Sequence, residues 1–166
     1  MKIVLWTIGM ILASGVASAA YDVTCNDGDC LRAGWQIQNT QTNQLVHVEC
    51  FNSACDLDGW VERDVLGRVV SYVKCKADGC FKDGFDLFNN WDRLITSSRC
   101  HLPPDEIGER DCLTCGWTSQ GDFGDVETYC HKENCWEFGL EVHSRQGVQR
   151  AHCKQRGCFK DGWLIF

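Results

Sequence analysis

One short pattern recurs along the chain about every 25 residues, and it constrains the fold more than any other feature. The pattern is two cysteines separated by four residues, then three residues, a glycine and usually an aromatic residue. Residues 75–85 read CKADGCFKDGF, and residues 153–163 read CKQRGCFKDGW. A period this regular indicates a structural repeat in which each copy is one supersecondary unit. The first cysteines of the copies are Cys25, Cys50, Cys75, Cys100, Cys130 and Cys153.

The residues between each glycine and the next cysteine alternate between apolar and polar side chains around a central turn. Residues 59–75 (GWVERDVLGRVVSYVKC) show this alternation, which is typical of a β-hairpin. The distance from the glycine to the next cysteine is 16 residues in three copies and 14 in two. Because the difference is two residues, every side chain keeps its face of the strand. One face then carries small and β-branched residues, and the other carries charged ones.

The predicted apolar face includes Val48, Val73, Leu94 and Thr128, and it has to be covered. Glu62 shares this face and is expected to need a partner or a position at the rim. The sequence therefore predicts an all-β fold of about six antiparallel β-hairpin repeats in a curled sheet, closed as a barrel or a sandwich. An open hairpin solenoid is the alternative. The chain starts and stops on half a hairpin, and in a closed structure these two halves are expected to pair.

Aromatic residues follow most of the repeat glycines and share the apolar face. We interpret them as core residues rather than as a sugar-binding platform. Strands in alternate positions lie about 10 Å apart, so these rings are expected to interleave with side chains of the strand between them instead of touching each other. The residues are Trp35, Trp60, Phe85, Trp117 and Trp163, with Leu140 in the remaining copy.

The spacing leaves disulfide pairing open between C-x4-C bonds within each copy and bonds between neighbouring copies. In the stretched fourth copy, eleven residues separate Cys100 from Cys112, and Cys112 precedes Gly116 by four residues, as in every other copy. Cys115 is then the thirteenth cysteine, either an intermolecular or reactive thiol or a buried one. The cysteines predicted to form disulfides are Cys25, Cys30, Cys50, Cys55, Cys75, Cys80, Cys100, Cys112, Cys130, Cys135, Cys153 and Cys158.

Residues 1–19 have the layout of a secretory signal peptide. Lys2 precedes an apolar run from Ile3 to Ala13, and Ala17-Ser18-Ala19 forms a small-residue cleavage site. Residues 20–166 would then form a single exported domain with no membrane span after the signal is cleaved. Thirteen cysteines in an exported chain indicate a disulfide framework in an oxidising compartment. The predicted location is secreted, either extracellular or periplasmic.

Several function classes find no support in the sequence. A net charge of −7 without a basic cluster argues against nucleic acid as a partner. No G-x-S-x-G, H-E-x-x-H or glycine-rich phosphate loop follows the signal segment, so no catalytic residue and no cofactor is predicted. No metal site is predicted either. The C-x4-C units lack the histidine pairs of zinc sites, and the C-x-x-C from Cys112 to Cys115 lacks a βαβ setting.

The first functional hypothesis is a non-catalytic binding or structural module that takes a protein or glycan partner or assembles with itself. Its candidate binding residues are three aromatic residues interpreted as lying outside the repeat register, Trp91, Phe123 and Trp136. The insertion from His101 to Asp111 is a further candidate surface, because departures from a repeat mark places where something other than stacking is required.

Cysteine chemistry supplies a variant of this hypothesis and an alternative to it. In the variant, a bond through Cys115 joins two copies in a dimer. In the alternative, the chain is a thiol-redox or metal-binding protein that uses Cys100, Cys112 and Cys115. A small secreted hydrolase is the third hypothesis, since paired carboxylates can meet in space without any sequence motif.

Overall fold

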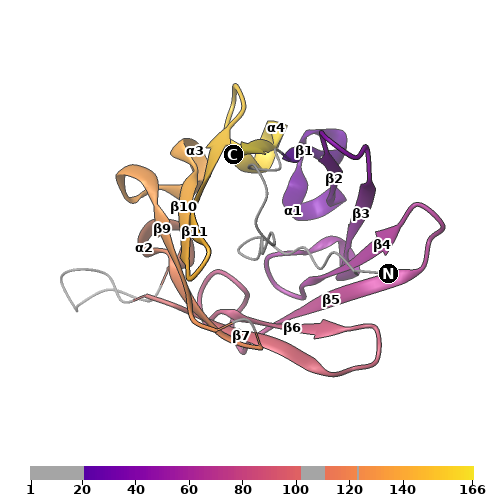
Figure 1. The fold of residues 1–166 in the computed structure, drawn as a ribbon, viewed down its shortest axis with the longest axis horizontal. Helices are drawn as coiled ribbons and strands as arrows, with labels where there is room; N and C mark the ends of the chain where they lie inside the picture. The colour runs from indigo at the N-terminus through magenta and orange to yellow at the C-terminus, as the bar shows by residue number, and fades with distance from the viewer. Residues whose placement is uncertain (1–20, 102–110, 123) are drawn as a thin grey trace.

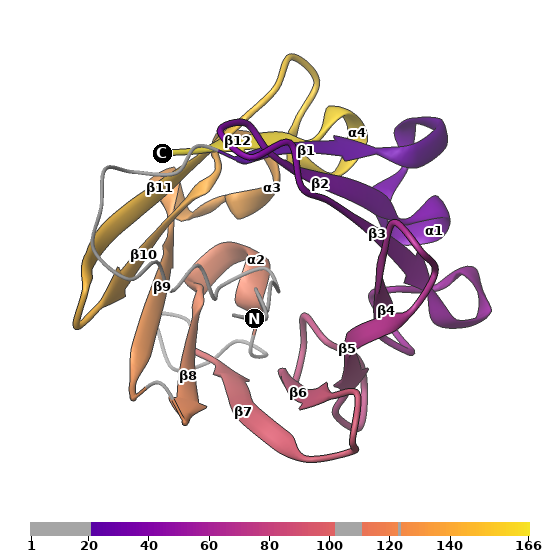
Figure 2. The same ribbon diagram turned by 45° about the vertical axis from the view of Figure 1, so that its right-hand side comes forward.

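Twelve antiparallel strands form the predicted hairpins and close into one barrel (Figures 1 and 2). A computed structural model of the chain describes residues 21–101, 111–122 and 124–166. The two terminal half-hairpins pair as expected, with Tyr21 opposite Ile165, so the barrel is closed and the open solenoid is excluded. The strands are β1 (Tyr21–Cys25), β2 (Trp35–Asn39), β3 (Leu45–Cys50), β4 (Trp60–Asp64), β5 (Val69–Cys75), β6 (Phe85–Asn89), β7 (Leu94–Cys100), β8 (Trp117–Gly121), β9 (Val126–Cys130), β10 (Leu140–Ser144), β11 (Gly147–Cys153) and β12 (Trp163–Ile165).

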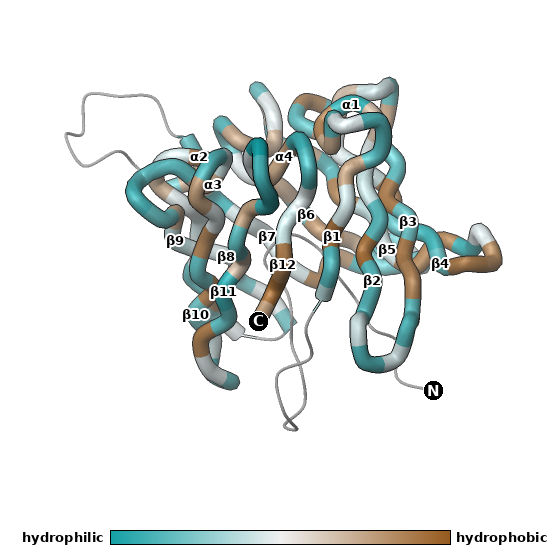
Figure 3. The backbone as a smooth tube through the Cα atoms, turned by 90° about the horizontal axis from the view of Figure 1, so that it is seen from above, coloured by the Kyte–Doolittle hydropathy of each residue, from teal (hydrophilic) through white to brown (hydrophobic). Residues whose placement is uncertain are grey.

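Short helices lie in the segments that join one hairpin to the next. Figure 3 shows the four α-helices at one end of the barrel and hairpin turns at the other. We call these the Cys-loop end and the hairpin end, where a Cys loop runs from the first cysteine of a unit to its glycine. Within the described ranges no helix is long and apolar enough to cross a membrane. The helices are η1 (Asn26–Gly28), α1 (Cys30–Ala33), η2 (Phe51–Ser53), α2 (Cys112–Cys115), η3 (His131–Glu133), α3 (Cys135–Phe138) and α4 (Cys158–Asp161).

Each Cys loop is closed by its own disulfide. The predicted C-x4-C bonds are confirmed, and pairing between neighbouring copies does not occur. In the stretched unit Cys100 is bonded to Cys112 across a sequence separation of 12. Closing a loop of six residues contributes about 2 kcal/mol in the chain-entropy model, because the bond restricts the unfolded chain. The disulfides therefore compensate for the small core of a single curled sheet.

The repeat glycine is required where each Cys loop enters its hairpin. Gly59 has a φ of +90°, and a Cβ atom there would lie 2.1 Å from the carbonyl oxygen of Val73 on the adjacent strand. The other five repeat glycines have φ values from +76° to +96°, and a Cβ would meet a neighbouring carbonyl oxygen at 1.9–2.2 Å. Close approach of two backbones therefore explains why glycine recurs in every unit.

The predicted apolar face lines the inside of the barrel, with one correction. Val48, Val73 and Thr128 are fully buried as expected, but Leu94 is 48% exposed. The reason is a β-bulge between β6 and β7, where an extra residue shifts the register next to Leu87. Ile95 takes the inward place and is 6% exposed. The bulge reverses the alternation locally, so simple parity assigned Leu94 to the wrong face.

The aromatic residues that follow the repeat glycines form one continuous layer inside the barrel, which we call the aromatic layer. All are buried, as predicted. They are not interleaved, however, because a closed barrel curves inward and brings side chains from alternate strands together. The contacting ring pairs, with centroid distances, are Trp35–Trp60 at 5.3 Å, Trp60–Phe85 at 6.0 Å, Phe85–Trp117 at 6.1 Å and Trp35–Trp163 at 6.2 Å.

The phrase that the chain repeats contains Lys-Asp-Gly, and its aspartate accepts a hydrogen bond within the Cys loop. Asp83 Oδ2 accepts a hydrogen bond from the backbone N–H of Asp78 at 2.7 Å. Asp161 Oδ2 accepts the equivalent bond from Arg156 at 2.7 Å, and the Arg156 guanidinium adds an ion pair. The phrase is therefore part of the scaffold, in which a side-chain oxygen stabilises a tight loop.

Asp161→Asn is expected to lower thermal stability at neutral pH and to make it less sensitive to acid. The hydrogen bond from the Arg156 side chain lowers the pKa of the Asp161 carboxyl, so the folded state favours the charged form. This stabilisation is complete above the unfolded-state pKa of about 4 and is lost as the pH falls through the lower folded-state pKa. Melting curves should show the gap between wild type and variant closing below about pH 4.

The matched control is Asp125→Asn, which changes an exposed aspartate outside the Cys loops. Its Tm should follow the wild type across the whole pH range. A gap between the wild type and Asp161→Asn that persists in strong acid would show that the charge of Asp161 is not what stabilises the loop.

Candidate functional site

The structure places the sequence-predicted aromatic residues at opposite ends of the barrel. Trp91 lies in the β6–β7 turn at the hairpin end and is 73% exposed. Trp136 lies in α3 at the Cys-loop end and is partly buried. Phe123 and residues 102–110 of the long insertion lie outside the described residues. Trp91 and Trp136 therefore do not share a site.

Trp136 belongs to a set of residues that occupy one position of the repeat. This position directly follows the second cysteine of each unit, and we call it the mouth position. Trp136 therefore occupies a recurring position of the Cys loop, which is distinct from the register of the aromatic residues that follow the repeat glycines. An apolar residue stands here in five of six units, and this was the signal that could have revealed the site. The six residues are Leu31, Asp56, Phe81, Leu113, Trp136 and Phe159.

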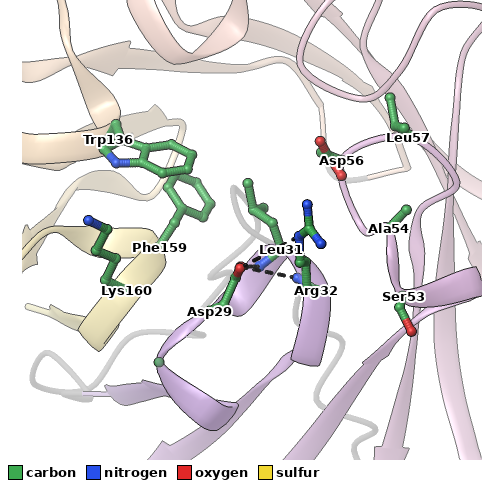
Figure 4. Close-up of a pocket in the computed structure, with 11 residues that line it drawn as sticks. Asp29, Leu31, Arg32, Ser53, Ala54, Asp56, Leu57, Trp136, Phe159 and Lys160 are labelled. Carbon is green, nitrogen blue, oxygen red and sulfur yellow. Dashed lines mark hydrogen bonds and ion pairs between the residues drawn. The ribbon is translucent and has the colours of Figure 1, made fainter.

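A pocket of about 460 Å³ opens between the Cys loops of the first, second, fifth and sixth units (Figure 4). We call it the mouth pocket. Much of its apolar lining comes from three mouth positions, Leu31, Trp136 and Phe159. Figure 4 shows Trp136 and Phe159 together on one side and Asp56 on the other. Segments far apart in the sequence therefore meet here because the barrel closes.

The aromatic side of the mouth pocket is built from packed rings. The rings of Trp136 and Phe159 lie 4.9 Å apart at an interplanar angle of 34°. Phe159 is 5% exposed and also packs on Phe81 at 5.6 Å and on Trp163 at 5.9 Å. These contacts hold Phe159 in place and connect the pocket to the aromatic layer below it.

Charged groups of both signs stand around the apolar lining. The Asp29 carboxylate caps α1 by accepting from the backbone N–H groups of Leu31 and Arg32 at 3.1 and 3.2 Å. It also lies 3.9 Å from the Arg32 guanidinium, whose side chain is 82% exposed. Asp56 adds a second carboxylate to the lining, and Lys160 adds an ammonium group. The pocket can therefore offer hydrogen-bond donors and acceptors around a central aromatic surface.

Backbone hydrogen bonds join neighbouring Cys loops and fix the walls of the pocket. The carbonyl oxygen of Leu31 accepts from the N–H of Cys55 at 2.8 Å, and that of Asp56 accepts from Cys80 at 2.8 Å. Each of these carbonyls belongs to a mouth position, and each donor is the second cysteine of the next unit. Disulfides and these bonds together preorganise the loops, which reduces the entropy cost of binding.

A second group of polar side chains lies buried on the inner face of the barrel. Glu62 is 1% exposed and accepts hydrogen bonds from Ser71 Oγ at 2.5 Å and from Trp60 Nε1 at 3.4 Å. The expectation that Glu62 needs a partner is confirmed. Ser98 and Ser119 share a hydrogen bond of 2.7 Å. We call this region the polar wall, and it comprises Glu62, Ser71, Thr96, Ser98, Ser119 and Thr128 on β4 to β9.

The predicted cysteine site is not assembled as three neighbouring thiols, because Cys100 and Cys112 share a disulfide. Cys115 ends α2, takes no part in the six disulfides and is partly buried. His101 Nδ1 lies 2.9 Å from the carbonyl oxygen of Cys115, so this nitrogen donates. In the described part of the chain no three His, Cys, Asp or Glu side chains gather in a way that could hold a metal ion. The Cys115-linked dimer stays a prediction.

No protein-family model, no curated protein and no solved structure matches this chain. The mouth pocket combines an aromatic surface with charged groups of both signs on loops that disulfides hold in place. Such a pocket is suited to holding a ligand.

Proposed function

We propose that this chain is an exported, non-catalytic binding module that takes its partner at the mouth pocket. In this proposal residues 1–19 are a cleaved signal peptide and residues 20–166 are the exported domain. Six disulfides support a working location in an oxidising compartment, where such bonds form and persist. The location is extracellular or periplasmic.

The mouth pocket is the observation that carries this proposal. Its volume of about 460 Å³ lies within the range of about 300–1,000 Å³ that is typical of small-molecule sites. It lies at the mouth of a barrel, a common place for ligand sites. Four separate Cys loops build it, and each loop is held by its own disulfide, so the pocket exists before a partner arrives.

The lining indicates the kind of partner. Trp136 and Phe159 offer an aromatic surface for an apolar ring face or an alkyl group. Arg32 and Asp56 stand where they can bind oxygen and nitrogen atoms at the edge of that group. The partner is therefore a small ligand, or a projecting group of a protein or glycan, with an apolar face and a polar rim.

Trp136→Ala is expected to weaken partner binding about 30-fold, because a buried aromatic anchor contributes about 2 kcal/mol or more at such a site. Partners would be selected from peptide and glycan libraries on the exported domain, and their affinities would be measured by calorimetry. Trp91→Ala is the matched control, since it removes an exposed tryptophan at the opposite end of the barrel. A partner whose affinity falls with Trp91→Ala but not with Trp136→Ala would place the binding site elsewhere.

A further inference from the structure

Asp56 departs from the repeat at the mouth position, where the other five units carry an apolar residue. It is partly buried and lines the mouth pocket. Its carboxylate has no hydrogen-bond or ion-pair partner among the described residues. A partly buried charge without a partner destabilises the folded state, because it has lost some of its contact with water. A positively charged group of a ligand would remove this cost.

Lys160 brings a charge of the opposite sign to the same pocket. It lies in α4, is exposed, and its ammonium group has no ion-pair partner among the described residues. Neighbouring charged groups are already engaged. Arg156 pairs with Asp161, and Arg32 lies 3.9 Å from Asp29. One carboxylate and one ammonium group of the lining therefore remain for a ligand to bind.

These two charges lie on opposite sides of the pocket. Figure 4 shows Lys160 on the side of the packed rings of Trp136 and Phe159, and Asp56 across the pocket from them. Asp56 belongs to the second Cys loop and Lys160 to the sixth, so closure of the barrel brings them to one site. A ligand that reaches both charges must cross the apolar lining between them.

We propose that the ligand of the mouth pocket is a short peptide with free ends, whose ammonium group binds Asp56 and whose carboxylate binds Lys160. This inference rests on the proposed function, because it names the partner of the same pocket. A single amino acid carries both charges on one carbon atom, whereas a short peptide separates them and places an apolar side chain between them. That side chain would pack on Trp136. Charge-assisted hydrogen bonds at the two ends would fix the direction of the peptide.

The test uses the chain with its six disulfides intact and four forms of one dipeptide, Leu-Phe. The forms are the free dipeptide, the N-acetylated dipeptide, the C-terminal amide and the dipeptide blocked at both ends. Binding is measured by calorimetry at neutral pH. The free dipeptide should bind most tightly, because each block removes one charge that the pocket recognises. A fully blocked dipeptide that bound as tightly as the free one would overturn the inference.

Asp56→Asn keeps the shape of the side chain and removes its charge. It is expected to weaken binding of the free dipeptide about tenfold, the effect of one hydrogen bond between charged groups. The affinity of the N-acetylated form should stay unchanged, because that form has no ammonium group. Lys160→Gln should weaken the free dipeptide about threefold, as expected for an exposed ion pair, and should leave the affinity of the amide unchanged.

Asp58→Asn is the matched control. Asp58 lies in the same Cys loop as Asp56, accepts a hydrogen bond from Asn52 at 3.1 Å and does not line the pocket. Its variant changes the net charge by the same amount and should bind all four forms as the wild type does. Equal losses for Asp56→Asn and Asp58→Asn would also overturn the inference, because the effect would then come from the net charge of the protein.

Other outcomes separate this inference from the proposed function. If Trp136→Ala weakens binding of the free dipeptide and Asp56→Asn does not, the mouth pocket is a binding site, but Asp56 does not select an ammonium group. If no form of the dipeptide binds while another class of ligand depends on Trp136, the proposed function holds and the peptide assignment is wrong. If the free dipeptide binds equally well to Trp136→Ala and Asp56→Asn, it binds outside the mouth pocket and the inference fails.

Discussion

Gly59→Ala is expected to prevent the barrel from forming. The new Cβ would lie 2.1 Å from the carbonyl oxygen of Val73. No side-chain rotation relieves this contact, because the oxygen belongs to the backbone and the backbone fixes the position of the Cβ. The residue would also have to keep a φ of +90°, which L-residues with a side chain rarely adopt. Separation of β4 from β5 would open the sheet in its middle. The variant should be recovered in low yield, without the cooperative melting transition of the wild type.

Gly67→Ala is the control for this experiment. Gly67 lies in the β4–β5 turn with a φ of +76°, but a Cβ there meets nothing within 4 Å. Only backbone strain remains in Gly67→Ala. The free energy of unfolding should therefore fall by about 1 kcal/mol, and the protein should still fold. If Gly59→Ala melted within a few degrees of Gly67→Ala, steric contact between the strands would not be the reason for the repeat glycine.

Trp60→Ala is expected to lower the free energy of unfolding by about 3–5 kcal/mol, the usual cost of truncating a large buried aromatic residue. Trp60 is fully buried, and its ring contacts Trp35 at 5.3 Å and Phe85 at 6.0 Å. The substitution would also remove a donor from Glu62, a buried carboxylate. The lost ring packing and the lost hydrogen bond to Glu62 both destabilise the folded state.

Chemical denaturation without reducing agent would measure this loss while the disulfides stay closed. Trp91→Ala serves as the comparison, since this tryptophan is 73% exposed and its removal should change stability by about 0.5 kcal/mol or less. A loss below about 1 kcal/mol for Trp60→Ala would mean that the aromatic layer does not form the core of the barrel.

Much of the fold could be predicted from the sequence, because the repeat and the two-residue alternation report directly on strands and their faces. The closure of the barrel followed from the complementary half-hairpins at the two ends. Two features had no such signal. The bulge that exposes Leu94 and buries Ile95 depends on how β6 and β7 twist, and alternation alone does not report it. Contact between Trp35 and Trp60 depends on the inward curvature of the closed sheet.

The candidate site was only partly predictable. Trp136 was named from the sequence as an aromatic residue outside the register of the glycine-aromatic positions, and not as one of six equivalent positions. Aligning the residues after each second cysteine would have placed Phe159 beside it as a candidate. A buried indole N–H without a hydrogen-bond partner among the described residues, such as that of Trp117, could not be identified in this way, because it is a property of the packed interior and not of a residue type.

The pairing of β1 with β12 determines which end of the barrel faces outward when the chain is linked to a surface or to another protein through its C-terminus. Both strands run between the Cys-loop end and the hairpin end, and Tyr21 and Ile165 pair at the end of each strand that is farther from the Cys loops. Figure 3 shows the C-terminus on that side, away from α1 and α4. A surface, a carrier protein or a further domain linked through Phe166 would therefore leave the mouth pocket facing outward. A molecule tethered in this way would display its pocket to the surrounding medium, and many copies side by side would all display it in the same direction.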